Sequence, residues 1–79
     1  MVEKRLHLTF PLSLVKEPII WRLGRDFKVI TNIRRANVTH EGGWVVLGLE
    51  GEELEIQRAV DYLVGRGVLV RPVDGQVLE

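Results

Sequence analysis

The sequence predicts one small α+β domain with the element order βαββαβ, in which two helices cover one face of a four-stranded antiparallel sheet. Four segments alternate or are rich in β-branched residues, two others repeat apolar residues at helical spacing, and glycine or proline separates them. The length of 79 residues allows a single domain, residues 1–79. We expect its core at about residues 4–73 and a loose tail at 74–79.

The N-terminal part of the chain predicts a strand followed by a short helix. Residues 4–10 alternate between apolar and polar side chains, as in a half-buried strand, and Pro11 ends the strand because proline has no N–H for the ladder. The next apolar residues are spaced for one helix face. We expect this helix to begin near Pro18 and to end at Gly24.

The middle of the chain predicts a hairpin of two strands. Residues 28–39 are rich in β-branched side chains, but the apolar parity changes partway, which indicates a bulge near Arg34 and Arg35. Residues 41–43 contain a Gly-Gly pair typical of a hairpin turn. The third strand is then expected over residues 44–51.

The last part of the chain predicts a second helix and a final strand. Glu52 lies at the expected helix start, where the positive end of the helix dipole favours an acidic residue. The apolar residues that follow are spaced i, i+3, i+4, i+7, and Gly65 and Gly67 are expected to stop the helix. Residues 68–71 form the last predicted strand.

No segment of the chain is expected to cover the second face of the sheet. By strand parity that open face carries His7, Thr9, Trp44 and Val46. Exposed apolar groups on such a face indicate an interface or ligand site, so Trp44 and Val46 are candidate interface residues. The alternative is that Trp44 packs locally at the start of its strand.

Composition excludes several classes of function. Eleven basic residues balance eleven acidic ones, whereas a nucleic-acid-binding domain is usually basic. An RNA-binding domain with this element order also carries several aromatic residues on its central strands, and the third strand here has one, Trp44. We therefore expect no nucleic-acid partner. No apolar stretch approaches the length of a membrane span and the N-terminus does not resemble a signal peptide, so we expect no membrane insertion and a cytoplasmic location.

The chain shows no recognisable catalytic or metal-binding pattern. It has no cysteine, and nothing spaced near His7 or His40 would complete a metal site. Ser13 has no histidine at a suitable position, and the glycines do not form a phosphate-binding loop ahead of a helix. We therefore expect no enzyme activity, no metal and no cofactor.

Arg34 and Arg35 form the only compact basic cluster within a predicted element, and Asn32 lies beside them. Charged residues on an edge strand commonly prevent unwanted strand pairing. The alternative is that the cluster binds a ligand, because asparagine both donates and accepts hydrogen bonds and arginine offers a fork for a carboxylate.

Four segments of the sequence resemble the NIL domain over about residues 4–73. They are Leu8–Pro11, Glu17–Ile20, Thr31–Val38 and Gly43–Leu47. The resemblance implies a ferredoxin-like fold, akin to the regulatory ACT domains. NIL domains occur at the C-terminus of methionine-importer ATPase subunits, where paired domains bind methionine and inhibit transport. They also precede iron–sulfur ferredoxin domains in proteins linked to homocysteine formation.

The triplet that gives the family its name, Asn-Ile-Leu, is Asn32-Ile33-Arg34 in this chain. The resemblance implies that Asn32, Ile33 and Arg34 contribute to a ligand site, and the charged third residue is closer to the ferredoxin-linked branch. Our leading hypothesis is a non-enzymatic module that recognises a sulfur amino acid, such as methionine, in a homodimer. The alternative hypothesis is an interaction module that docks to a ferredoxin or a sulfurtransferase without binding a metabolite.

Overall fold

The computed structural model describes residues 1–73, and its elements follow the predicted βαββαβ order with one short 3-10 helix added. In chain order they are β1 (Val2–Phe10), η1 (Leu12–Leu14), α1 (Ile19–Asp26), β2 (Val29–Thr39), β3 (Gly42–Gly51), α2 (Glu53–Arg66) and β4 (Leu69–Pro72). The predicted tail at 74–79 lies outside the described residues.

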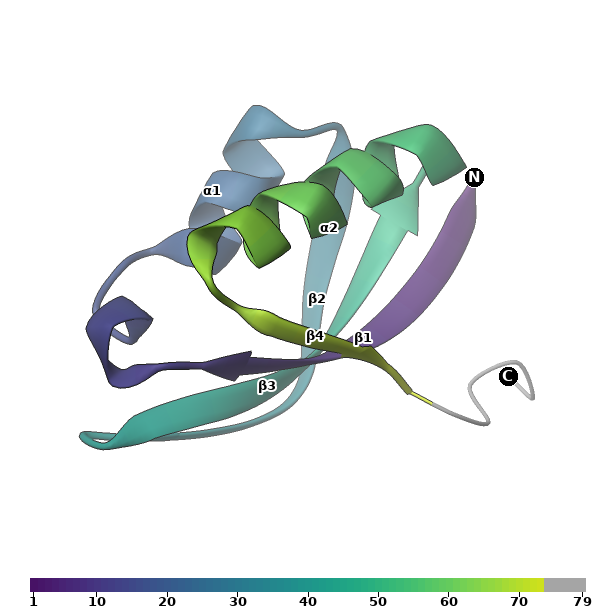
Figure 1. Ribbon diagram of the computed structural model, residues 1–79. Helices are drawn as coiled ribbons and strands as arrows, with labels where there is room; N and C mark the ends of the chain where they lie inside the picture. Colours follow the sequence, from purple (N-terminus) through teal and green to yellow (C-terminus); the bar gives the residue numbers. More distant parts are fainter. Residues whose placement is uncertain (74–79) are drawn as a thin grey trace.

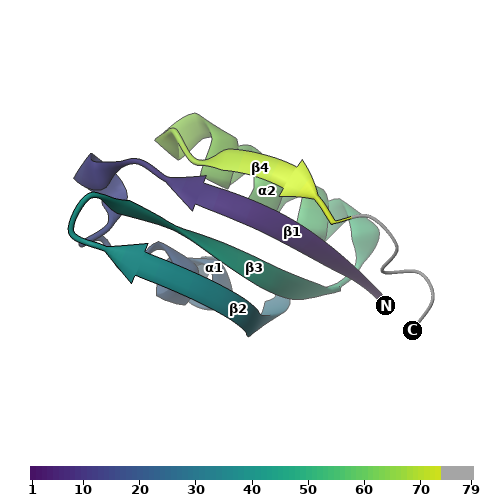
Figure 2. The same ribbon diagram turned by 90° about the horizontal axis from the view of Figure 1, so that it is seen from below.

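The four strands form one antiparallel sheet in the order β2-β3-β1-β4, with β1 and β3 in the centre. Both helices lie on the same side of this sheet (Figure 1). Seen from the other side, the strands lie in front and no helix covers them (Figure 2). The fold is therefore the predicted two-layer α+β sandwich with one open sheet face.

The core lies between the helices and the sheet, and apart from Phe10 its buried side chains are aliphatic. β1 and β3 contribute their inward residues, and each helix contributes one apolar stripe. The largest fully buried side chains are Leu8, Ile19, Leu23, Leu47, Leu49, Ile56 and Leu63. Each such side chain stabilises the fold by about 1.5–3 kcal/mol through the apolar area that it removes from water.

The strand register confirms the predicted sidedness of the central strands. Leu8 is opposite Val45 in the core, while His7 is opposite Val46 and Thr9 is opposite Trp44 on the open face. Successive side chains of a strand point to opposite faces, so these pairs fix which residues the open face presents.

The predicted bulge in the second strand is also confirmed. The pairing of β2 with β3 shifts between Ile33 and Arg35, which leaves Arg34 as the extra residue. Because of the bulge, Val38 returns to the helix side of the sheet. It is opposite Gly43, and Gly43 is on the helix side because the next residue, Trp44, is on the open face.

Three predicted boundaries were wrong. α1 continues past Gly24 to Asp26, and Phe27 caps it by donating its backbone N–H to the Leu23 carbonyl. Gly65 lies inside α2, and only Gly67 ends that helix, with φ of 98°, a left-handed conformation that glycine adopts without strain. The first strand begins earlier than residue 4, since Val2 pairs with Gly51 at the far end of β3.

Candidate functional site

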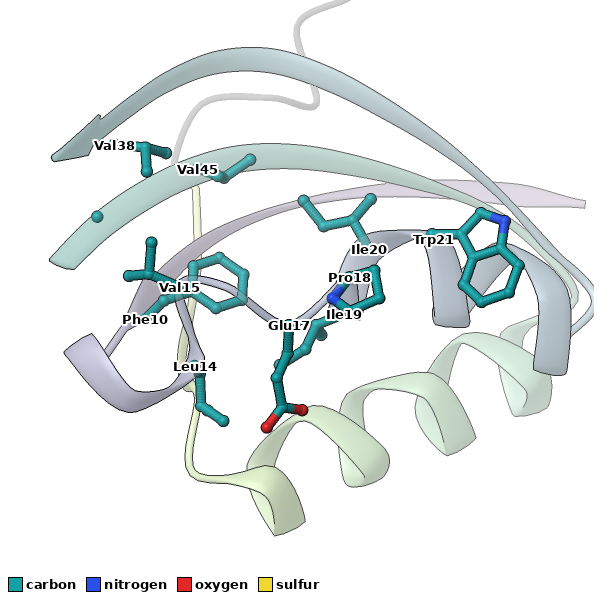
Figure 3. Close-up of a pocket in the computed structure, with 11 residues that line it drawn as sticks. Phe10, Leu14, Val15, Glu17, Pro18, Ile19, Ile20, Trp21, Val38 and Val45 are labelled. Atoms are coloured by element: carbon teal, nitrogen blue, oxygen red, sulfur yellow. The ribbon is translucent and has the colours of Figure 1, made fainter. Parts of the chain in front are cut away.

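The strongest candidate site is an apolar cleft between the first helix and the β2–β3 hairpin. The chain segment that links β1 to α1 forms its floor: η1 buries Leu14, and Pro18 then leads into α1. The opposite wall comes from the strands, with Val38 of β2 and Val45 of β3 facing Ile20 of α1 (Figure 3). The cleft has a volume of about 240 Å³.

The walls of this cleft are almost entirely hydrocarbon. Its lining residues are Phe10, Leu14, Val15, Glu17, Pro18, Ile19, Ile20, Trp21, Val38, Gly43 and Val45. Trp21 and Val38 are 59% and 58% exposed, so two large apolar side chains remain in contact with water at its mouth. Such a cleft can bury the apolar side chain of a small ligand, but it offers little to hold a charged group.

Glu17 is the only ionisable residue in the lining, and it is already engaged. Its carboxylate accepts hydrogen bonds from Arg66 and from Arg22, the latter at 2.9 Å. The guanidinium of Arg66 and then that of Arg22 lower the pKa of Glu17, so the carboxylate stays ionised at neutral pH. Figure 3 shows it directed toward α2, away from the strands. Glu17 therefore ties the cleft floor to the end of α2.

The predicted ligand residues Asn32, Ile33 and Arg34 lie together on the edge strand β2, but they do not line this cleft. Asn32 is opposite Gly48 on the open face, and Ile33 is on the helix side with 55% of its surface exposed. Arg34 is the bulge residue. Within one chain the structure does not bring Asn32 to the cleft, and the role of the triplet stays a prediction.

Sequence reasoning did not find the cleft. Its walls come from the loop between Pro11 and Pro18, from α1 and from the distant strand end at Val38. These segments are joined only by the fold, and no spacing in the sequence connects them. The one usable signal was the Ile19-Ile20 pair, of which Ile19 enters the core and Ile20 only partly does.

The open face holds the two predicted interface residues, Trp44 and Val46, both half-buried. The ring of Trp44 stacks on His7, with ring centroids 5.3 Å apart and an interplanar angle of 18°. Arg35 reaches over the same ring, its guanidinium carbon 6.0 Å from the ring centroid. Trp44 therefore packs against neighbours on the surface, as the local-packing alternative expects, and it remains part of an uncovered face.

In residues 1–73 no three His, Cys, Asp or Glu side chains come together as a metal site would require. His7 is engaged with Trp44, and His40 is exposed with its imidazole 3.9 Å from the Glu41 carboxylate. None of the described helices is long and apolar enough to span a membrane.

A βαββαβ sandwich hosts many unrelated functions, so the fold alone does not identify what this domain does. The model of the NIL domain matches residues 4–72, so the chain belongs to the NIL domain family and has a ferredoxin-like fold. No curated protein matches the chain. Among solved structures, the chain is similar to the C-terminal domain of an ABC transporter ATP-binding protein from Enterococcus faecalis. The two are 25% identical, with a TM-score of 0.80, and the match covers 91% of this chain and 84% of that one.

Proposed function

We propose that this NIL domain is a non-catalytic regulatory module that binds a small amino acid with an apolar side chain, methionine first among them. The observation that carries the proposal is the apolar cleft of about 240 Å³ between α1 and β2–β3. A thioether side chain is flexible and polarisable, and it fills an irregular apolar cleft well. Family membership and the likeness to a transporter ATP-binding protein's C-terminal domain support a regulatory role.

The ammonium and carboxylate groups of the amino acid need partners that the cleft lining of one chain does not supply. Glu17, its one ionisable residue, is held by two arginines. We therefore propose that the site is completed in a homodimer, in which a second copy closes the mouth of the cleft. β2 is an edge strand whose outer side pairs with no strand in residues 1–73, and Ile33 and Val38 are exposed along it. Unpaired backbone groups and exposed apolar side chains are what a second copy would cover.

Calorimetric titration of the purified domain with methionine, homocysteine, cysteine and S-adenosylmethionine tests ligand binding. We expect methionine to bind and to raise the melting temperature, because a ligand that binds only the folded state stabilises it. Val38→Asp places a charge at the cleft mouth and should abolish binding. Val64→Asp is the matched control, since Val64 is 59% exposed but lies on α2 outside the cleft. No heat and no thermal shift with any of the four compounds would remove the ligand proposal.

The family triplet is tested separately from the cleft. Asn32→Ala should weaken binding by about 1–3 kcal/mol if the amide hydrogen-bonds the ligand, because the ligand group would lose its partner. Asn32 is exposed, so the variant should fold. Unchanged affinity would place the site in the cleft alone. Arg34→Leu restores the usual triplet, and tighter methionine binding by this variant would identify Arg34 as a determinant of specificity.

Sedimentation at micromolar concentration tests the dimer. We expect a species of twice the 9.0 kDa chain mass, which Val38→Asp shifts toward monomer. A single 9.0 kDa species for the unsubstituted chain would refute the dimer while leaving the calorimetric result to decide ligand binding.

A further inference from the structure

A row of paired residues crosses the whole open face of the sheet. Arg35 of β2 is opposite Val46 of β3, Val46 is opposite His7 of β1, and His7 is opposite Arg71 of β4. This row therefore has an arginine at each end and an imidazole between them. Trp44 lies beside it and contacts both His7 and Arg35. The face is thus organised around one indole ring, with the imidazole of His7 on one side and the guanidinium of Arg35 on the other.

The arginines of the helix layer differ in their surroundings from Arg35 and Arg71 of the open face. Those of the helix layer form ion pairs with three carboxylates, as Arg22–Glu17, Arg66–Glu17, Arg25–Asp26 and Arg58–Glu55. Arg35 and Arg71 of the open face are exposed and form no ion pair with any of residues 1–73. The carboxylates of this face, Glu3 and Glu50, are opposite each other two rows beyond the arginines. Although the net charge of the chain is zero, the row that holds Arg35 and Arg71 therefore forms a cationic patch.

Arg35 and Arg71 lie on the two edge strands of the sheet, at opposite ends of the same row. Arg35 and Arg71 are three strand spacings apart in one row, which is about 14 Å between their Cα atoms. A partner that contacts both arginines and Trp44 must cover the sheet from one edge strand to the other. A protein surface can do so, and each guanidinium can donate two parallel hydrogen bonds to one of its carboxylates.

The aromatic contacts favour a protein over a nucleic acid. His7 and Arg35 reach the Trp44 ring from the two strands that flank β3, so a nucleobase could stack on it only by displacing one of them. Tryptophan and arginine are also the residues enriched where protein interfaces gain most of their binding energy. Next to Trp44 a shallow hollow between Thr9, Asn37 and the hairpin leaves room for a partner side chain.

We propose that the open sheet face docks an acidic protein partner, which presents carboxylates to Arg35 and Arg71 on the two edge strands and packs against Trp44. This surface is on the opposite side of the sheet from the cleft. The proposal goes beyond amino-acid binding and does not depend on it.

The test measures binding of a fluorescent glutamate-rich peptide to the purified domain at low ionic strength. A length-matched serine–glycine peptide and a single-stranded oligothymidylate of similar charge are the comparison probes. Arg35→Gln combined with Arg71→Gln removes the two anchors. Arg25→Gln combined with Arg58→Gln is the matched control, because it removes the same charge from the helix layer. Circular dichroism verifies that both variants fold.

We expect the glutamate peptide to bind, to shift the amide resonances of β1 and β3, and to lose affinity as salt is added. The Arg35/Arg71 variant should bind about tenfold more weakly, because two exposed ion pairs are lost, and the Arg25/Arg58 variant should bind as the parent does. Equal losses in the two variants would show non-specific attraction and overturn the proposal. No binding, resonance shifts in the helices, or tighter binding of the oligothymidylate would overturn it as well. None of these outcomes changes the methionine titration, so the two proposals fail separately.

Discussion

The stack of His7 on Trp44 makes a quantitative prediction about the open face. The rings belong to the neighbouring strands β1 and β3 and are diagonal neighbours, since His7 is opposite Val46 and Trp44 is opposite Thr9. With centroids 5.3 Å apart and planes 18° from parallel, the pair has the geometry of a stacked aromatic contact. Such contacts are worth about 0.5–1.5 kcal/mol beyond the area that they bury. We expect a coupling free energy in that range.

A double-mutant cycle in urea, followed by far-ultraviolet circular dichroism, measures this coupling. The variants are His7→Ala, Trp44→Leu and the two combined. For a chain of this size the urea dependence is about 1 kcal/mol per molar, so the coupling corresponds to about 0.5–1.5 M in the unfolding midpoint. The cycle of His7→Ala with Trp21→Leu is the control, because Trp21 lies on α1 in the helix layer. Residues without a shared contact should add within about 0.3–0.5 kcal/mol. A His7–Trp44 coupling no larger than this control would refute the stacking interpretation.

Three further predictions concern the scaffold. Leu47 has no exposed surface, so Leu47→Ala should lower the free energy of unfolding by about 3–5 kcal/mol, as measured by thermal melting. Leu54 is 82% exposed, so Leu54→Ala should lower it by less than about 0.5 kcal/mol. Similar losses for the two variants would contradict the assigned core. Gly65→Ala inside α2 meets no atom within 4 Å and should stabilise by about 0.5–1 kcal/mol, whereas Gly67→Ala at φ of 98° should destabilise, and the same sign for both would contradict the helix end. The pKa of Glu17 is lowered in the folded state, so its ion pairs stabilise the fold above the ordinary pKa of 4.5, and this stabilisation is lost as the pH falls through the folded pKa. In Glu17→Gln, the free energy of unfolding should therefore change less with pH in this acid range. An unchanged pH profile would contradict the ion pairs of Glu17 with Arg22 and Arg66.

Much of this fold could be predicted from the sequence because strand alternation is a local signal. The alternation of residues 4–10 fixed the faces of β1, and the parity change beside Arg34 revealed the bulge. The end of α1 could not be predicted in this way. A glycine inside an exposed helix costs only about 1 kcal/mol, and here that cost is offset by the packing of Phe27, whose ring lies 5.6 Å from that of Tyr62 on α2. Tertiary contact therefore overrode the local signal at Gly24.

The functional surfaces were less predictable, for two different reasons. The cleft joins segments that are far apart in the chain, such as the loop before Pro18 and the strand end at Val38, so no local pattern marks it. The cationic patch was hidden by the balance of charge over the whole chain. The strand pairing shows that Arg35 and Arg71 share a row, and the ion pairs show that the arginines of the helix layer have carboxylate partners.

The two surfaces lie back to back on the same strand, which constrains how they can act together. Val45 faces the cleft, while its neighbours Trp44 and Val46 face the open side. The same alternation on β2 puts Val38 at the cleft and Asn37, its neighbour, opposite Trp44. A ligand that moved this hairpin on entering the cleft would also move the indole against which Arg35 rests. Linkage then requires reciprocity: whatever factor the ligand imposes on partner affinity, the partner must impose on ligand affinity. Only one layer of sheet separates the two surfaces, which makes a short physical path for such coupling. If β2 and β3 did not move when the ligand bound, the ligand would not change the affinity for the partner.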